Sequence, residues 1–105
     1  MANYVAVAKL ADLKEDTGRT IEVKGRLVAL FLQQGTVHAI DDICPHMGAS
    51  LGSGSVCDGI VMCPWHGWRF RVTDGAWADA PNAGGGVTHY DTKVDDGTVY
   101  LNIGW

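Results

Sequence analysis

Two short motifs carry the residues best suited to bind a metal. They are Cys44-Pro45-His46 and Cys63-Pro64-Trp65-His66, and sixteen residues separate His46 from Cys63. Each motif supplies one thiolate and one imidazole, and its proline fixes φ and removes an N–H group. Two Cys and two His side chains can hold one Zn²⁺ tetrahedrally. They can also hold an iron–sulfur group, with two thiolates on one iron and two imidazoles on the other.

The order of the ligands along the chain favours the second of these centres. Zinc fingers usually pair Cys with Cys and His with His, and a helix often carries the histidines. Here each motif mixes the two types, and the sequence predicts no helix near them. Mixed pairing lets each loop give one ligand to each of two irons. A structural zinc site remains the alternative.

The residues before these motifs follow the patterns of short β-strands. Alternating apolar and polar residues predict one strand over residues 21–26, and a continuous apolar run predicts a second over residues 27–32. Residues 33–35 are a turn signal, after which alternation resumes over residues 36–41. Two hairpin-like units therefore precede Cys44.

The rest of the chain is also dominated by strands and glycine-rich turns. We expect a helical turn at 9–16, and two loops within 42–68 that are joined by a strand at 59–62. A strand at 69–73 is expected to lead into a hairpin turn at Asp74-Gly75, followed by a loop at 79–86. The chain is expected to close with a hairpin, whose strands at 87–94 and 98–103 flank a turn at 95–97. Many short strands with glycine-rich turns predict an all-β barrel or sandwich.

Length, charge and the apolar runs limit the class of protein. A chain of 105 residues predicts a single domain over residues 1–105, with the site in a subdomain of about residues 42–70. The net charge of −4 argues against nucleic acid as a partner, because phosphate binding needs clustered Lys and Arg. The N-terminus has no secretory signal pattern, and the longest apolar run is too short for a bilayer. We therefore expect a cytoplasmic protein without membrane contact, whose three reduced cysteines indicate a metal or a free thiol.

The sequence resembles the Rieske-type ferredoxins. The matching segments are Cys-Pro-His-Met-Gly-Ala-Ser-Leu at 44–51 and Cys-Pro-Trp-His-Gly-Trp-Arg-Phe at 63–70. The resemblance implies stacked antiparallel sheets with a two-loop cluster-binding subdomain at one tip, and one [2Fe–2S] cluster per chain. It implies that Cys44 and Cys63 bind the buried iron, and that His46 and His66 bind the outer iron nearest solvent.

Four other positions indicate the subtype. Rieske proteins of respiratory complexes are similar but carry an extra Cys in each loop, and they place Ser and Tyr hydroxyls against the cluster sulfurs. The corresponding residues here are Ala49, Trp65, Trp68 and Phe70. Hydrogen bonds to the sulfurs stabilise the reduced, more negative state. Without them we predict a low reduction potential, roughly −150 mV.

The resemblance also implies the role of the protein. Oxygenases that share His66-Gly67-Trp68 continue into a catalytic iron domain, for which this sequence has no further residues. We therefore expect an electron carrier rather than an enzyme, passing one electron from a flavin-dependent reductase to a terminal oxygenase. A small Rieske subunit of an NAD(P)H-dependent nitrite reductase is the alternative.

Several residues have a structural interpretation beside a functional one. For Cys57 a small buried hydrophobe is favoured over a redox thiol. His38, expected to point outward, and His89 are expected to be ordinary strand residues. For Trp65 and Trp68, shielding of the cluster is favoured over an electron path.

The acidic pairs Asp41-Asp42 and Asp95-Asp96 fit either docking of a basic partner or turn formation. Met47 fits either a cover over the cluster or a core filler.

Overall fold

The computed structural model describes residues 3–44, 48–64, 67–79 and 86–103, and within them the chain is almost entirely β. The strands are β1 Tyr4–Lys9, β2 Gly18–Val23, β3 Arg26–Gln33, β4 Thr36–Asp41, β5 Ser55–Cys57, β6 Ile60–Met62, β7 Arg69–Arg71, β8 His89–Tyr90, β9 Thr92–Asp95 and β10 Thr98–Asn102. Two single 3₁₀ turns, η1 Leu10–Asp12 and η2 Leu51–Ser53, complete the described elements.

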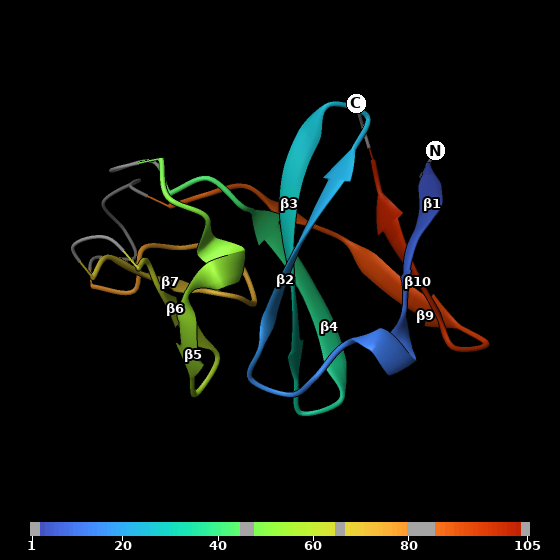
Figure 1. Cartoon of the computed structure of the whole chain (residues 1–105), viewed down its shortest axis with the longest axis horizontal. Coiled ribbons are helices and arrows are strands. Elements are labelled where there is room, and N and C mark those ends of the chain that lie inside the picture. Colours follow the sequence, from blue (N-terminus) through green and yellow to red (C-terminus); the bar gives the residue numbers. More distant parts are fainter. Residues whose placement is uncertain (1–2, 45–47, 65–66, 80–85, 104–105) are drawn as a thin grey trace.

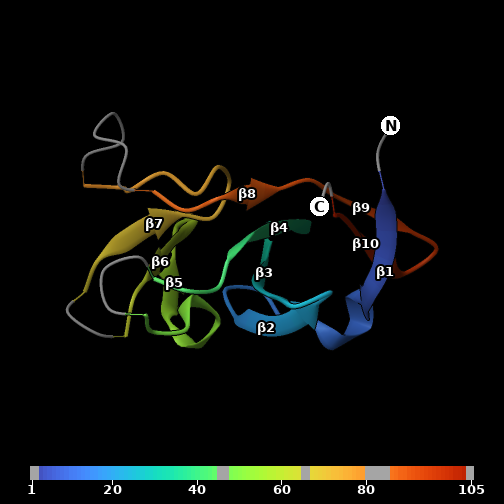
Figure 2. The same cartoon turned by 90° about the horizontal axis from the view of Figure 1, so that it is seen from above.

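The strands form three antiparallel sheets, with the orders β1-β10-β9, β2-β3-β4-β8 and β5-β6-β7. The four-stranded sheet lies in the middle, with β5-β6-β7 at one end and β1-β10-β9 at the other (Figures 1 and 2). This arrangement confirms the expected all-β fold of stacked antiparallel sheets.

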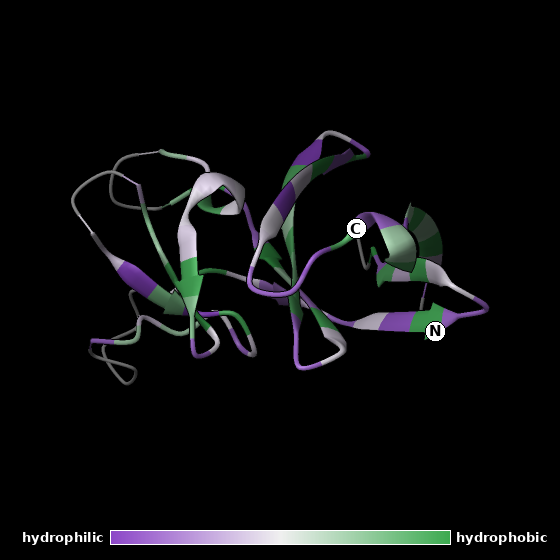
Figure 3. Ribbon diagram, turned by 60° about the horizontal axis from the view of Figure 1, so that its bottom comes forward, coloured by the Kyte–Doolittle hydropathy of each residue, from purple (hydrophilic) through white to green (hydrophobic). Residues whose placement is uncertain are grey.

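Strand β3 is buried on both faces because a core lies on each side of it. Val28 and Leu30 belong to the core shared with β1 and β10. Ala29 and Phe31 belong to the core shared with β5, β6 and β7. All four are fully buried, which explains why β3 reads as a continuous apolar run. In Figure 3 the strands carry the hydrophobic segments, while several hairpin turns are hydrophilic.

Four hairpins turn on a residue followed by glycine, with positive φ at both positions. These turns are Lys24-Gly25, Gln34-Gly35, Asp58-Gly59 and Asp96-Gly97. Two positive φ values are typical of a type I′ turn, whose twist matches that of the flanking strands. The expected single strand over residues 21–26 is therefore wrong, because the chain turns at Lys24-Gly25 and starts β3 at Arg26.

Three other expected boundaries also differ. Residues 42–68 hold an additional strand, β5, which the Asp58-Gly59 turn pairs with β6. The expected strand over 87–94 is two strands in different sheets, since β8 pairs with β4 and β9 pairs with β10. The expected hairpin turn at Asp74-Gly75 lies within a wider reversal, since the N–H of Arg71 donates to the carbonyl of Ala76 and a bridge joins Phe70 to Trp77.

No helix in the described ranges is long and apolar enough to cross a membrane. The expected helical turn at 9–16 is limited to η1, and most of the expected loop at 79–86 lies outside the described residues.

Candidate metal centre

Two loops of equal length present the two cysteines of the motifs. In the first loop the N–H of Cys44 donates to the carbonyl of Ala49 at 2.9 Å, and in the second the N–H of Cys63 donates to the carbonyl of Trp68 at 2.6 Å. The first loop follows the bridge between Ile43 and Ser50, and the second follows a paired residue of β6. Each cysteine therefore stands one residue beyond a strand pair, where the backbone is held on both sides.

Each loop also carries a glycine four residues after its cysteine. Gly48 has φ +72° and Gly67 has φ +73°. The sequence motifs suggest glycines that let the backbone approach a bulky group. A Cβ at Gly48 would meet nothing within 4 Å, and one at Gly67 would make only an ordinary contact. The left-handed backbone conformation, rather than crowding by described atoms, therefore explains both glycines.

Both cysteines belong to one apolar core. Cys44 and Cys63 are each 1% exposed, neither is in a disulfide, and they share their core with Phe31, Leu51 and Phe70. Ionised thiolates buried among apolar side chains are costly unless a metal or counter-charge compensates them. Two such thiols at the ends of matching loops fit a group that binds thiolate sulfur.

Several residues of the two motifs are outside the described part of the chain. They are Pro45, His46, Met47, Trp65 and His66. The expected roles of the two histidines as outer ligands, of Trp65 as a shield and of Met47 therefore remain predictions.

A buried acidic residue anchors the first loop to the four-stranded sheet. The Oδ1 atom of Asp42 accepts hydrogen bonds from Thr20 Oγ1 at 2.8 Å, Ser50 Oγ at 2.9 Å and the N–H of Gly52 at 2.8 Å. Asp42 is 1% exposed, so it is not available to dock a partner. Asp41 accepts a hydrogen bond from the hydroxyl of Tyr90. Structural contacts thus account for the acidic pair Asp41-Asp42. The sequence feature that points to Asp42 is its position two residues before Cys44.

An aromatic stack packs against the core at the end of the second loop. The indole rings of Trp68 and Trp77 are stacked, with centroids 4.5 Å apart and planes at 8°. Phe70 lies beside Trp68, with centroids 6.4 Å apart. Both tryptophans pack against the core that contains Cys44 and Cys63. The sequence motifs single out Trp68 but give no signal for Trp77, which a turn after β7 brings back to the loop.

The expected burial of Cys57 is wrong, since its side chain is exposed. In β5 the side chain of Val56 packs against the core, so the two-residue period of the strand turns Cys57 outward.

His38 also differs from expectation. It is half-buried rather than pointing outward, and together with Cys57 it lines a cavity of about 610 Å³. Desolvation by burial, and secondarily the neighbouring His89, lower the pKa of His38 below its usual value. His89 lies in β8, and no group of three or more metal-ligating side chains is found among the described residues.

Comparison with known families identifies the class of protein. Residues 3–100 match the Rieske [2Fe-2S] domain family, so the chain belongs to it. The cofactor of the protein is therefore a [2Fe–2S] cluster, and the donor set fits it through the two buried thiols. The alternative of a structural zinc site is not supported.

Curated relatives fall into two groups by length. The chain is 34% identical over 97 residues to the cholesterol 7-desaturase nvd of Drosophila melanogaster, covering 90% of this chain and 21% of that protein. It is 32% identical over 99 residues to the ferredoxin component of the alkene monooxygenase system of Xanthobacter autotrophicus, covering 93% of this chain and 80% of that protein. The chain thus spans about a fifth of the first relative and most of the second.

Solved structures share the fold over nearly the whole chain. The ferredoxin of carbazole 1,9a-dioxygenase from Nocardioides aromaticivorans IC177 is 29% identical, with a TM-score of 0.84, covering 96% of this chain and 98% of that chain. A protein described as the small subunit of an NADPH nitrite reductase is 26% identical, also with a TM-score of 0.84, covering 94% and 97%.

Proposed function

We propose that this protein is a one-electron carrier whose cluster is held by Cys44, Cys63, His46 and His66. The observation that carries the proposal is the pair of matching loops, which present two buried thiols within one core. When bound, a [2Fe–2S] cluster supplies a site that takes up and releases a single electron. No acid–base or nucleophilic machinery is needed for this role, so the protein is a component of an oxidoreductase system and not itself an enzyme.

The described residues support this role by holding the loops and limiting access of water. Asp42 fixes the first loop to the four-stranded sheet, and Trp68 and Trp77 stack beside the end of the second. Fixed loop ends keep Cys44 and Cys63 in place in both oxidation states, which reduces the reorganisation that accompanies electron transfer.

A terminal oxygenase is the acceptor that the comparisons favour. Two relatives that the chain matches over most of their length are ferredoxin components, one of the alkene monooxygenase system and one of the naphthalene 1,2-dioxygenase/salicylate 5-hydroxylase systems. A carbazole 1,9a-dioxygenase ferredoxin, 27% identical with a TM-score of 0.84, forms a complex with its oxygenase. We infer that this chain docks transiently on such an oxygenase, through an interface at the small end of the size range.

The remaining parts of the proposal rest on the sequence. The electron donor is a flavin-dependent reductase, and the protein is cytoplasmic and acts as a single domain over residues 1–105. The cluster-binding subdomain spans about residues 42–70, which includes β5, β6 and most of β7.

The ligand set is tested by single substitutions with matched controls. Purified protein is expected to contain two irons and two acid-labile sulfides per chain and to show visible absorbance. Cys44→Ser and Cys63→Ser are expected to lose the cluster, whereas Cys57→Ser, which changes an exposed thiol, keeps it. His46→Ala and His66→Ala are expected to lose it, with His89→Ala as their control. A colourless protein, or a cluster that survives Cys63→Ser, would contradict the proposal.

The nitrite reductase alternative is supported by the small-subunit structure at 26% identity. A nitrite reductase subunit and an oxygenase ferredoxin differ in how long the partner protein stays bound. A nitrite reductase subunit is expected to co-purify with a large partner from its native cells, while a free ferredoxin purifies alone. Gel filtration of the native protein followed by iron analysis of each peak separates the two.

A further inference from the structure

In the stacked pair of Trp68 and Trp77, the indole Nε1–H of Trp77 is a buried hydrogen-bond donor that has no acceptor in the described part of the chain. A buried N–H group without a hydrogen-bond partner costs free energy. The indole N–H of Trp77 therefore does not stabilise the protein through a hydrogen bond to any described group. The ring itself has a clear contact, since it lies face to face with the indole of Trp68. The contribution of Trp77 in the described structure is therefore made by its ring.

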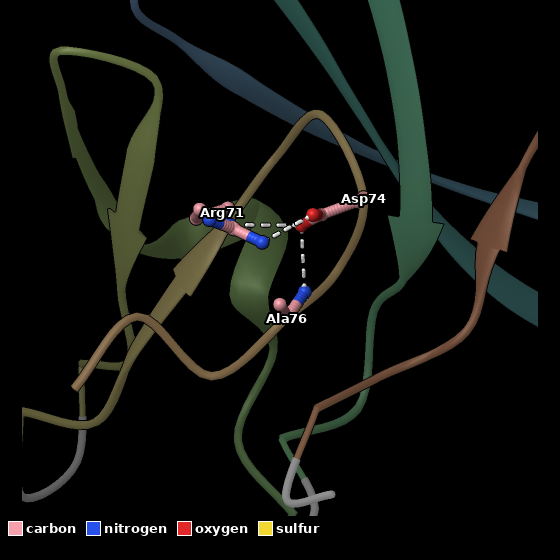
Figure 4. A network of polar contacts seen from close by, with 3 residues as sticks. All are labelled: Arg71, Asp74 and Ala76. Atoms are coloured by element: carbon pink, nitrogen blue, oxygen red, sulfur yellow. Dashed lines mark hydrogen bonds and ion pairs between the residues drawn. The ribbon is translucent and has the colours of Figure 1, made fainter. Parts of the chain in front are cut away.

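A reinforced turn leads the chain from β7 back to Trp77. Figure 4 shows the polar contacts of this turn among Arg71, Asp74 and Ala76. Oδ1 of Asp74 accepts hydrogen bonds from the N–H of Ala76 at 2.9 Å and from Nε of Arg71 at 3.1 Å, and Oδ2 forms an ion pair with the same guanidinium. Desolvation raises the pKa of Asp74, but the hydrogen bonds from Ala76 and Arg71 outweigh it, and the pKa is lowered.

The main chain closes the same turn. The N–H of Arg71 donates to the carbonyl of Ala76 at 2.9 Å, and the bridge from Phe70 to Trp77 then places these two residues opposite each other. Side chains directly opposite in an antiparallel pair lie on the same face. Phe70 faces the core that contains both cysteines, so Trp77 is directed to that side as well.

Trp68 connects this turn to the cluster loop. Its carbonyl accepts the N–H of Cys63 at 2.6 Å, while its side chain is held by the ring of Trp77. The residue whose carbonyl closes the second loop therefore also carries the indole on which Trp77 stacks.

We propose that Trp77 is a positioning residue that holds Trp68 over the loop of Cys63, keeps water from the cluster and thereby lowers its reduction potential. The inference rests on the proposed ligand set. Reduction adds one negative charge, which water stabilises better than an apolar cover does. The environment around a metal site controls solvent access and hence its potential. Removing the ring of Trp77 thus stabilises the reduced state and raises the potential.

Three variants and a control test this role. Trp77→Leu removes the flat ring but keeps apolar volume, Trp77→Ala removes both, and Trp77→Phe keeps an aromatic face without the N–H. Tyr4→Ala removes a partly buried ring from β1, in the sheet that does not contact this core. For each holoprotein we would measure the midpoint potential by direct voltammetry, the visible circular dichroism of the cluster, and the rate of bleaching by an iron chelator.

The expected order of the variants separates the effect of the aromatic ring from the effects of lost apolar volume and of the lost N–H group. The midpoint potential and the bleaching rate are expected to rise in Trp77→Leu and to remain near wild type in Trp77→Phe and Tyr4→Ala. Trp77→Ala is expected to exceed Trp77→Leu, and if it fails to fold the leucine variant decides. An unchanged potential in Trp77→Leu would overturn the proposal, as would an equal shift in Trp77→Phe. A wild-type protein without a cluster would instead contradict the proposed function.

Discussion

The hydroxyl of Thr20 donates a hydrogen bond to Asp42 at 2.8 Å, and this contact joins the edge strand β2 to the loop of Cys44. Asp42 directly follows β4 and stands two residues before the cysteine, so the bond fixes the point where the chain leaves the central sheet. Gly52 packs closely against both partners, because a Cβ there would lie 2.2 Å from Thr20 Oγ1 and 2.9 Å from Asp42 Oδ1. The first loop is thus anchored by a buried acceptor rather than by strand pairing alone.

Replacing Asp42 with Ala is expected to destabilise the protein by roughly 3 kcal/mol, because it removes three hydrogen bonds to a buried carboxyl group. The bonds lost are those from the hydroxyls of Thr20 and Ser50 and from the N–H of Gly52. Urea unfolding of the holoprotein, followed by circular dichroism, measures the change. Asp95→Ala, at an exposed position in the last hairpin, is the control and should change stability little. Equal midpoints for the two variants would show that the buried network contributes nothing.

Gly48→Ala and Gly67→Ala are each expected to cost about 1 kcal/mol, because an L-residue is strained at positive φ. Both positions have this conformation within a cluster loop. Gly97→Ala, at φ +75° in a distant hairpin with open space around it, carries the same backbone penalty. The loop variants should therefore lose the cluster faster in the presence of a chelator than Gly97→Ala, although the three have similar unfolding midpoints. A cluster equally stable in all three would contradict the assigned role of the two loops.

The all-β class of the fold followed from local patterns, while the contacts that hold the site did not. The apolar run of β3 and the alternation of β4 are properties of neighbouring residues, so they could be read directly. The short strand β5 was missed although Asp58-Gly59 is a hairpin signal, and the exposure of Cys57 was missed with it.

The roles of Asp42 and Trp77 depend on residues distant in the sequence. Asp42 reaches Thr20 across 22 positions, and Trp77 meets Trp68 only after the chain reverses. A local pattern cannot distinguish such an aspartate from a turn residue, because both are polar residues next to a loop. The cysteines could be predicted because metal chemistry restricts the residue types and their spacing within each motif.

Phe70→Tyr is expected to raise the reduction potential from a wild-type value of roughly −150 mV, by offering a hydroxyl donor to the cluster sulfurs. Phe70 is fully buried in the same core as Cys44 and Cys63, and the resemblance to respiratory Rieske proteins places a hydroxyl at this position. Phe31→Tyr adds a hydroxyl to the same core at a position without that correspondence. It should lower stability without raising the potential. Voltammetry of both variants decides, and a wild-type midpoint above roughly +100 mV would contradict the low-potential assignment.

His38 is expected to make the stability of the protein depend on pH near neutrality. Desolvation, and secondarily His89, lower its folded pKa below the usual 6.5, so the unfolded chain binds a proton more readily than the fold does. Stability is therefore greatest above pH 6.5, falls as the pH drops below it, and levels off beneath the folded pKa. His38→Gln should reduce this dependence of the urea midpoint, measured from about pH 5 to 8. His89→Gln should reduce it less, since that residue is the smaller cause. An identical pH dependence in wild type and His38→Gln would assign the effect to other groups.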